Sequence, residues 1–209
     1  LFHNDGKADF YWYREDAPVE LRQTAWCAEK ATEFIKSRTD DTPWLLSVNC
    51  FDPHPPFDAP KHLVDKYLER NIPDPIFNES DLLLGEQLKR AHHQSKGVNA
   101  PSDALRRNRA SYYGMCELVD LHFGRIIDAL DELGIRDDTI IIYTSDHGEM
   151  LGDHGMTHKG CRFYDGSVRV PLIFSCPARF DCNKVVGGLA ELTDIAPTIA
   201  ELCGIEFTD

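Results

Sequence analysis

The stretch from Ser145 to Lys159, SDHGEMLGDHGMTHK, contains side chains that are suited to binding a metal ion and an anion. Asp146 and His147 are adjacent and offer a carboxylate oxygen and an imidazole nitrogen, and both atoms bind divalent cations. Lys159 follows a glycine-rich turn and could reach an anionic group held on the same cation. In the alternative interpretation, Asp146 only caps a helix and the histidines face solvent. The close spacing favours a metal site formed by Asp146 and His147.

Two predicted strands would position these groups. Residues 139–144, TIIIYT, form an apolar, β-branched run that is typical of a buried strand. A second strand is predicted at Trp44 to Cys50, and a proline-rich loop leads from its end to His54. Ligands of open α/β sheets bind beyond the carboxyl ends of the strands, so a shared cleft is expected there. Four side chains should converge on it: Asp146, His147, Lys159 and His54.

The remaining pattern alternates helices with strands. Helical spacing of apolar residues predicts a helix from Pro18 to about Ser37, and a long helix that Ser102 caps and Gly134 ends. Residues 57–100 are irregular and too long for a simple connection, which indicates an excursion on the substrate side. The alternation predicts an α/β fold with a mostly parallel sheet flanked by helices on both faces.

Composition excludes several classes of partner. The 209 residues provide one core, and a net charge of −13 argues against nucleic acid as a partner. No run of 18 apolar residues is present, so no membrane span is predicted. The seven cysteines show no C-x-x-C pairing, which favours a reducing compartment, and we expect a cytoplasmic location. The sequence leaves the oligomeric state open.

Four landmarks in order resemble the sulfatases of the alkaline-phosphatase-like superfamily, especially the branch near phosphonate monoester and choline-sulfate hydrolases. The metal motif at 145–159 is one landmark. The loop NCFDPHPPF at 49–57 is similar to the family's PHPPF loop, and RVPLI at 169–173 is similar to its RVPL strand. The stretch LTDIAPT at 192–198 resembles the start of a helix near the end of the family's large domain. The chain is therefore expected to be the central part of an incomplete alkaline-phosphatase-like core.

The resemblance implies a sulfuric ester hydrolase that uses a divalent metal, calcium or alternatively manganese. His54 would contact the sulfate ester, and His54 and Lys159 would assist the attack and the departure of the alcohol. The attacking group would be a formylglycine made from Cys/Ser-x-Pro-x-Arg, and this motif is expected outside the chain, so that the isolated chain would be inactive. Ser175 to Arg179 matches the pattern but follows a strand without the helix that would bind an anion, so it is rejected.

Other polar residues have more than one interpretation. Asp153 and His154 either orient the metal ligands or shape the turn, and His158 is exposed or lines the substrate site. Arg169 is expected to pair with a carboxylate, and His92-His93 to lie on a solvated helix surface. Two functional alternatives stay open: the same machinery acting on phosphonate or phosphate esters, which an Asp-His pair favours, and a catalytically inactive truncated domain.

Overall fold

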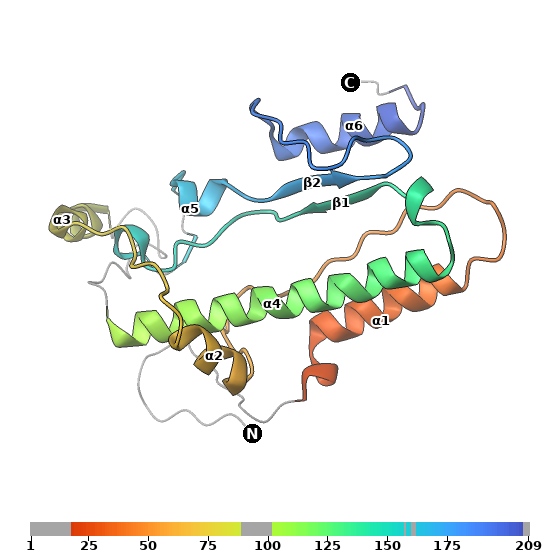
Figure 1. The fold of residues 1–209 in the computed structure, drawn as a ribbon. Coiled ribbons are helices and arrows are strands. Elements are labelled where there is room, and N and C mark those ends of the chain that lie inside the picture. The colour runs from red at the N-terminus through yellow and green to blue at the C-terminus, as the bar shows by residue number, and fades with distance from the viewer. Residues whose placement is uncertain (1–17, 89–101, 157, 160–161, 207–209) are drawn as a thin grey trace.

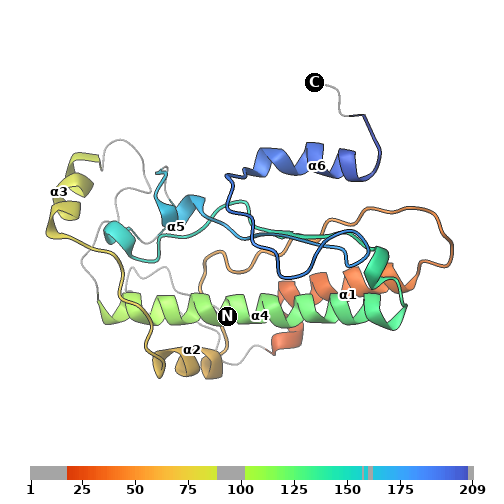
Figure 2. The ribbon, with the colours of Figure 1, turned by 45° about the horizontal axis from the view of Figure 1, so that its top comes forward.

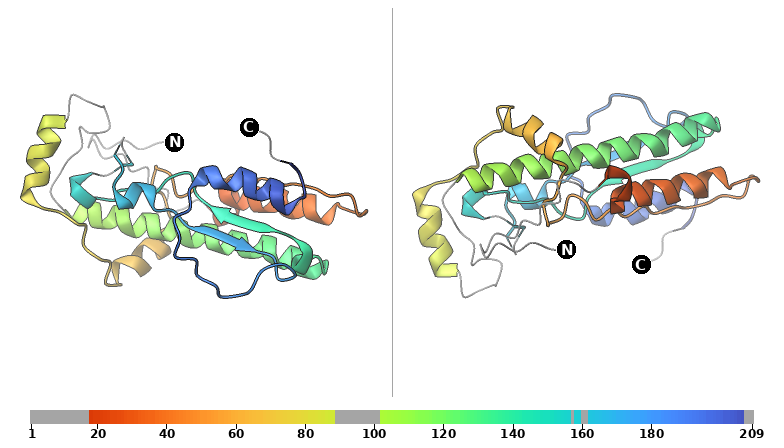
Figure 3. Two further views of the ribbon diagram at one scale, coloured as in Figure 1. Left: turned by 90° about the horizontal axis from the view of Figure 1, so that it is seen from above. Right: turned by 90° about the horizontal axis from the view of Figure 1, so that it is seen from below.

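A computed structural model describes residues 18–88, 102–156, 158–159 and 162–206. Its elements form three layers (Figures 1 and 2). The middle layer is a two-stranded sheet of β1 (Ile141–Thr144) and β2 (Leu172–Ser175). The helices α1 (Gln23–Lys36) and α4 (Asp103–Glu132) lie side by side on one face, and α6 (Ile195–Leu202) lies over the other (Figure 3). Helices therefore cover both faces of the sheet, as predicted.

The long helix α4 is the central scaffold, and the sequence predicted it correctly. Ser102 caps it, because its hydroxyl accepts a hydrogen bond from the Leu105 backbone N–H at 3.2 Å. At the other end, Gly134 adopts a φ of +68°, and the Ile135 N–H donates to the Leu130 carbonyl at 3.1 Å. No helix among the described residues is both long and apolar enough to cross a membrane.

The predicted irregular region at 57–100 is partly helical. It contains α2 (Lys61–Leu68) and α3 (Glu79–Leu88), while His92-His93 lies outside the described residues. Helix α2 packs against α4 through Val64, which is fully buried in a cluster with six other residues. These are Phe57, Ala59, Ile72, Ala110, Met115 and Leu151. The apolar face of α2 is only two side chains wide, which explains why helical periodicity was not evident in the sequence.

The sheet differs from the prediction in direction and extent. Among the described residues, β1 pairs only with β2, and this pairing is antiparallel, with Ile141 opposite Ser175. The segment Trp44 to Cys50, predicted to be a strand, is extended, but no backbone–backbone hydrogen bond joins it to another described segment. Two of its side chains pack on the core, but Leu45 is 74% exposed. The predicted mostly parallel sheet is therefore not seen within these residues.

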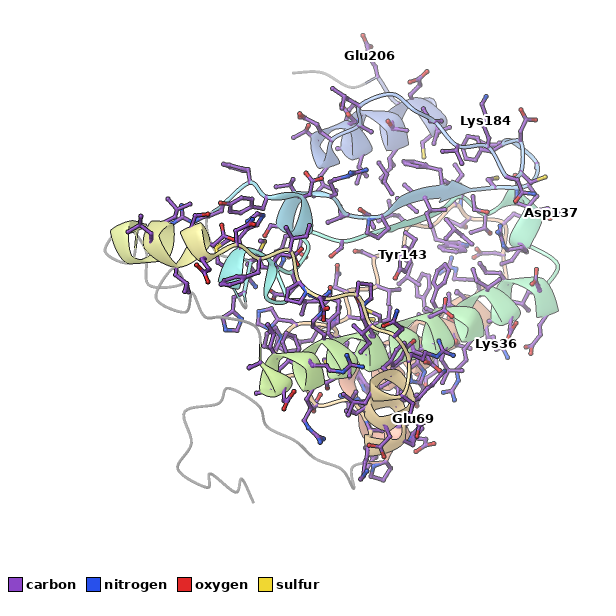
Figure 4. All side chains as sticks on the ribbon, turned by 60° about the vertical axis from the view of Figure 1, so that its left-hand side comes forward. Lys36, Glu69, Asp137, Tyr143, Lys184 and Glu206 are labelled. Carbon is purple, nitrogen blue, oxygen red and sulfur yellow. The ribbon has the colours of Figure 1, made fainter. Side chains whose placement is uncertain are left out.

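A cavity of about 750 Å³ is lined by residues of both the 44–50 segment and β1. No described backbone–backbone hydrogen bond joins the two segments. Figure 4 shows Tyr143 of β1 on the side of the sheet that faces α4, and the Tyr143 ring lies 5.2 Å from the Phe123 ring. The same cavity is lined by His122, which is 1% exposed and whose two ring nitrogens have no partner among the described residues. Burial lowers the pKa of His122 and favours its neutral form.

Close packing of α4 on α2 depends on Gly114, and this can be tested. A Cβ at Gly114 would lie 2.9 Å from the Cβ of Ala59 and 3.0 Å from that of Leu63. We expect Gly114→Ala to lower the free energy of unfolding by about 1–3 kcal/mol, because neither neighbouring Cβ can move independently of its backbone. Gly124 is the matched control, since nothing lies within 4 Å of its added Cβ. Gly124→Ala should stabilise by about 0.5–1 kcal/mol in the same urea titration. Equal effects at both positions would contradict this packing.

Candidate active site

Asp146 and His147 follow β1 after a single residue and present two metal-binding atoms together. His147 Nε2 lies 3.4 Å from Asp146 Oδ2. His147 Nδ1 lies 2.9 Å from the Gly148 carbonyl oxygen, which can only accept, so Nδ1 carries the proton. Nε2 therefore has its lone pair available. Two atoms that each bind an ion at about 2.0–2.4 Å lie roughly 3 Å apart, so the pair fits one shared cation.

The pair accounts for only part of a metal shell. Within the described ranges, no group of three or more histidine, cysteine, aspartate or glutamate side chains is arranged to hold a metal ion. The donor set of one carboxylate and one imidazole suits a divalent cation with oxygen and nitrogen ligands. Further ligands would have to come from other residues, from water or from the substrate.

The turn after the pair is held by direct backbone contact at Gly148. Its N–H donates to the carbonyl of Ser167 at 2.7 Å, and Ser167 lies within the short helix α5 (Asp165–Val168). A Cβ at Gly148 would lie 2.1 Å from the Gly166 carbonyl oxygen, so only glycine allows this approach. The Ser167 hydroxyl also donates to the Lys159 carbonyl at 3.0 Å. Helix α5 therefore fixes both the metal pair and the backbone of Lys159.

His54 reaches the same cavity from the other side. Asp52, Pro53 and His54 line it together with Asp146 and His147. His54 Nδ1 lies 2.7 Å from the Pro55 carbonyl oxygen and therefore carries a proton. The His54 ring also contacts the Phe51 ring, with centroids 4.7 Å apart. Because Nδ1 is committed, neutral His54 can only accept at Nε2, and only the imidazolium form can donate there.

Lys159, predicted to converge on the same cleft, is not among the residues that line this cavity, but its charge acts on Glu149, which does line it. Burial raises the pKa of the Glu149 carboxyl to about 7, and the positive charge of Lys159 opposes that shift. Burial lowers the pKa of His158, and Lys159 and His54 lower it further. The His158 side chain is half-buried and does not line the cavity described above, so the substrate-lining interpretation stays a prediction. Sequence analysis did not single out Glu149; its only signal was a carboxylate within an apolar and glycine-rich stretch.

Asp153 and His154 are not among the residues that line this cavity, and they contact the excursion instead. They form a 3₁₀ turn, η4 (Asp153–Gly155). Asp153 Oδ1 accepts a hydrogen bond from the Ile76 N–H at 3.0 Å, and the His154 N–H donates to the Ile76 carbonyl at 2.6 Å. The His154 ring stacks on Tyr164 with centroids 4.1 Å apart. These contacts support the interpretation that both residues shape the turn.

Arg169 and the rejected motif at 175–179 both make contacts within the fold. Arg169 Nη1 is 3.4 Å from Asp165 Oδ2, and both side chains are largely exposed. Such a surface ion pair contributes little to stability. In the motif, Arg179 Nη1 donates to the Leu202 carbonyl of α6 at 2.7 Å. A turn, and no helix, follows Ser175, as the sequence predicted.

The two interpretations of Asp153 predict different measurements. If it anchors the excursion, Asp153→Ala should lower the free energy of unfolding by about 1 kcal/mol, because the Ile76 N–H loses its acceptor. Proteolysis near Ile76 should become faster, and metal affinity should stay unchanged. Asp128→Ala, at an exposed position on α4, is the control and should change neither quantity. A tenfold or larger loss of metal affinity in Asp153→Ala would instead assign it to orienting the metal ligands.

The chain is similar in sequence to known proteins. A family model described as sulfatase matches residues 1–205. The chain is 32% identical over 199 residues to an arylsulfatase of Clostridium perfringens, covering 90% of the chain and 40% of the relative. It is 34% identical over 206 residues to a multifunctional alkaline phosphatase superfamily protein of Trinickia caryophylli, covering 90% of the chain and 39% of the relative.

A solved structure shows a similar fold. The phosphonate monoester hydrolase of Agrobacterium radiobacter matches with a TM-score of 0.76 and 30% identity, over 91% of this chain and 40% of that one. The chain therefore spans about two fifths of the length of these relatives.

Proposed function

Because this chain belongs to the sulfatase family, we propose that it is the central part of the catalytic domain of a metal-dependent sulfuric ester hydrolase. One observation supports this most strongly: Asp146 and His147 line the same cavity as His54, although they follow different segments of the chain. In the complete domain we expect the 44–50 segment and β1 to belong to a larger, mostly parallel sheet. Their carboxyl ends would then form the substrate cleft.

Asp146 and His147 would hold the divalent metal, calcium or alternatively manganese. A bound divalent ion polarises the ester oxygens and stabilises negative charge that develops on them. Asp146 contributes charge and an oxygen, while His147 contributes Nε2, oriented by the hydrogen bond from Nδ1 to Gly148. The formylglycine nucleophile and the other ligands would be supplied from outside these 209 residues.

His54 and Lys159 would act on the ester itself. Lys159 places a positive charge near the nonbridging or leaving-group oxygens, where it stabilises the transition state. His54 donates from Nε2 only as the imidazolium ion, because its Nδ1 proton is held by the Pro55 carbonyl. In that form it can hydrogen bond to the ester and pass a proton to the departing alkoxide. The His158 side chain would line the substrate beside them.

A phosphonate or phosphate ester is the second candidate substrate. The fold matches a phosphonate monoester hydrolase with a TM-score of 0.76, and the metal pair is Asp-His. The cations that neutralise sulfuryl oxygens would serve phosphoryl oxygens equally well. In either case we expect a small-molecule or saccharide ester as the substrate, and the net charge of −13 argues against a nucleic acid.

A reducing, cytoplasmic location is part of the proposal. The six cysteines within the described residues are all free thiols, and burial raises the pKa of Cys50 and of Cys116 to about 11. Thiols with raised pKa values react slowly, because the thiolate is the reactive form. These two half-buried cysteines therefore serve packing.

Activity of the full-length protein tests the proposal. Asp146→Asn and Lys159→Met are each expected to lower kcat/KM for p-nitrophenyl sulfate by about 100-fold or more, because each removes charge that stabilises the transition state. Arg169→Met is the control and should change it less than about threefold, since Arg169 pairs with exposed Asp165. The ratio of rates with p-nitrophenyl sulfate and p-nitrophenyl phenylphosphonate decides between the two substrates. Full activity in Asp146→Asn would overturn the metal assignment.

Metal preference tests the two ligands separately. Oxygen ligands favour calcium, whereas an imidazole nitrogen favours transition metals such as manganese. His147→Asn should therefore shift the preference towards calcium, and Asp146→Asn should weaken binding of every divalent ion. Calorimetric titration of both variants of the full-length protein with calcium and manganese provides the measurement. If the two substitutions act alike on both metals, His147 does not bind the ion.

A further inference from the structure

Three consecutive side chains at the start of α1 each contact a different point of the loop that carries His54. These are Arg22, Gln23 and Thr24, and the loop spans residues 49–58. Arg22 is the N-cap residue of α1, and Gln23 and Thr24 form its first turn. Neighbouring residues on a helix point in different directions, so three neighbours can reach a curved loop at three places.

Gln23 holds the entrance of the loop with both ends of its amide. Its Oε1 accepts a hydrogen bond from the Phe51 N–H at 2.8 Å, and its Nε2 donates to the Asn49 carbonyl at 3.3 Å. The 44–50 segment lacks backbone–backbone hydrogen bonds to other described segments, so this amide replaces a missing sheet partner at its carboxyl end.

Thr24 holds the loop one residue further on. Its hydroxyl donates to Asp52 Oδ2 at 2.5 Å, and the Thr24 side chain is almost fully buried. Burial raises the pKa of Asp52, while the Thr24 hydrogen bond and the charge of Arg22 oppose that shift. Asp52 directly precedes Pro53 and His54, so its position sets where the proline-locked turn begins.

Arg22 holds the exit of the loop. Its Nη1 donates to the Asp58 carbonyl at 2.9 Å, and its Nη2 forms an ion pair with the Asp58 carboxylate. The Arg22 side chain is only 7% exposed. A buried guanidinium with a carboxylate and a carbonyl as partners is a directional anchor, because its donors lie in one plane.

We propose that Arg22, Gln23 and Thr24 act as a clamp of positioning residues that sets His54 at the ester. The catalytic role that this proposal gives to His54 rests on the proposed function. The contacts of Arg22, Gln23 and Thr24 with the loop do not depend on that function. Within the loop, the His54 ring contacts the Pro55 carbonyl and the Phe51 ring, and the His54 N–H donates to the Phe51 carbonyl at 3.0 Å. These contacts orient His54 within the loop, so its position relative to the metal pair depends on how the loop is held. Helix α1 packs on α4, which also packs on the loop exit through Ser111 and the Ala59 N–H at 3.1 Å. The clamp thereby connects His54 to the common scaffold.

Thr24→Val in the full-length enzyme is the central test. It removes the hydroxyl at nearly constant volume. A misplacement of about 1 Å costs on the order of 100-fold in rate, so we expect kcat to fall about 10- to 100-fold with little change in KM or metal affinity. Thr24→Ser keeps the hydroxyl and should restore most of kcat. Thr32→Val, the same change at a half-buried position on the same helix, should leave kcat unchanged.

A double-mutant cycle separates positioning from general damage. If Thr24 acts through His54, Thr24→Val should cause no further loss in a His54→Ala background. An equal loss in both backgrounds would overturn the clamp, and so would failure of Thr24→Ser to rescue.

Hydrogen exchange provides a readout that does not depend on catalysis. Thr24→Val and Gln23→Leu should each speed amide exchange at Phe51 and His54, with α4 unchanged. If His54→Ala retains full activity, the proposed role of His54 fails, and this measurement alone then decides the clamp. Unchanged exchange at both amides would overturn it.

Discussion

Packing against the long helix α4 is the constraint on which the rest of the structure depends. Its amino-terminal half packs on α2 at Gly114, where the two helices approach within Cβ contact. Its carboxyl-terminal half packs on α1, and Phe123 contacts Tyr143 of β1. Arg109 reaches the turn after the metal pair, donating to the Leu151 carbonyl at 2.8 Å. One rigid rod therefore supports both segments that carry the candidate catalytic groups.

The loop that carries His54 and the turn that follows Asp146 are held mainly by side-chain hydrogen bonds and close glycine contacts. Regular sheet pairing contributes less. The loop with His54 depends on α1, and the turn after Asp146 depends on Gly148 meeting the α5 backbone. Backbone N–H and C=O groups in such turns have no strand-to-strand hydrogen bonds, so each group needs another specific partner. A site held by individual contacts is sensitive to single substitutions far from the reacting atoms.

The sequence predicted the features that depend on local pattern. The cap at Ser102, the end of α4 at Gly134 and the apolar run that becomes β1 follow from residue types within a few positions of each other. Strand pairing at Trp44 to Cys50 could not be predicted in the same way. Its apolar composition favours an extended segment, but pairing requires a neighbouring strand, and no described strand pairs with its backbone.

The sequence identified the residues of the candidate site, but it did not identify the contacts that hold those residues in place. The landmark motifs identified Asp146, His147 and His54, and the structure brings all three to one cavity. The turn-shaping contacts of Asp153 and the contacts of Arg22 depend on partners 77 and 36 residues away in the chain. Pattern within one segment carries no information about such distant partners, which explains why Asp153 had two interpretations.

The charged groups around the cavity affect how an anionic ester can bind there. The chain carries a net charge of −13, and Asp146, Asp52 and Glu149 line the cavity proposed for an anionic ester. When ionised, these carboxylates would repel the substrate at short range, and burial raises the pKa of both Asp52 and Glu149, which favours their neutral forms. The positive charge of Lys159 interacts with the half-buried carboxyl of Glu149, and His54 is positively charged only when it is protonated. If Asp146 and His147 bind a divalent cation, as proposed, its charge would offset these carboxylates and favour binding of an anionic ester at the same place.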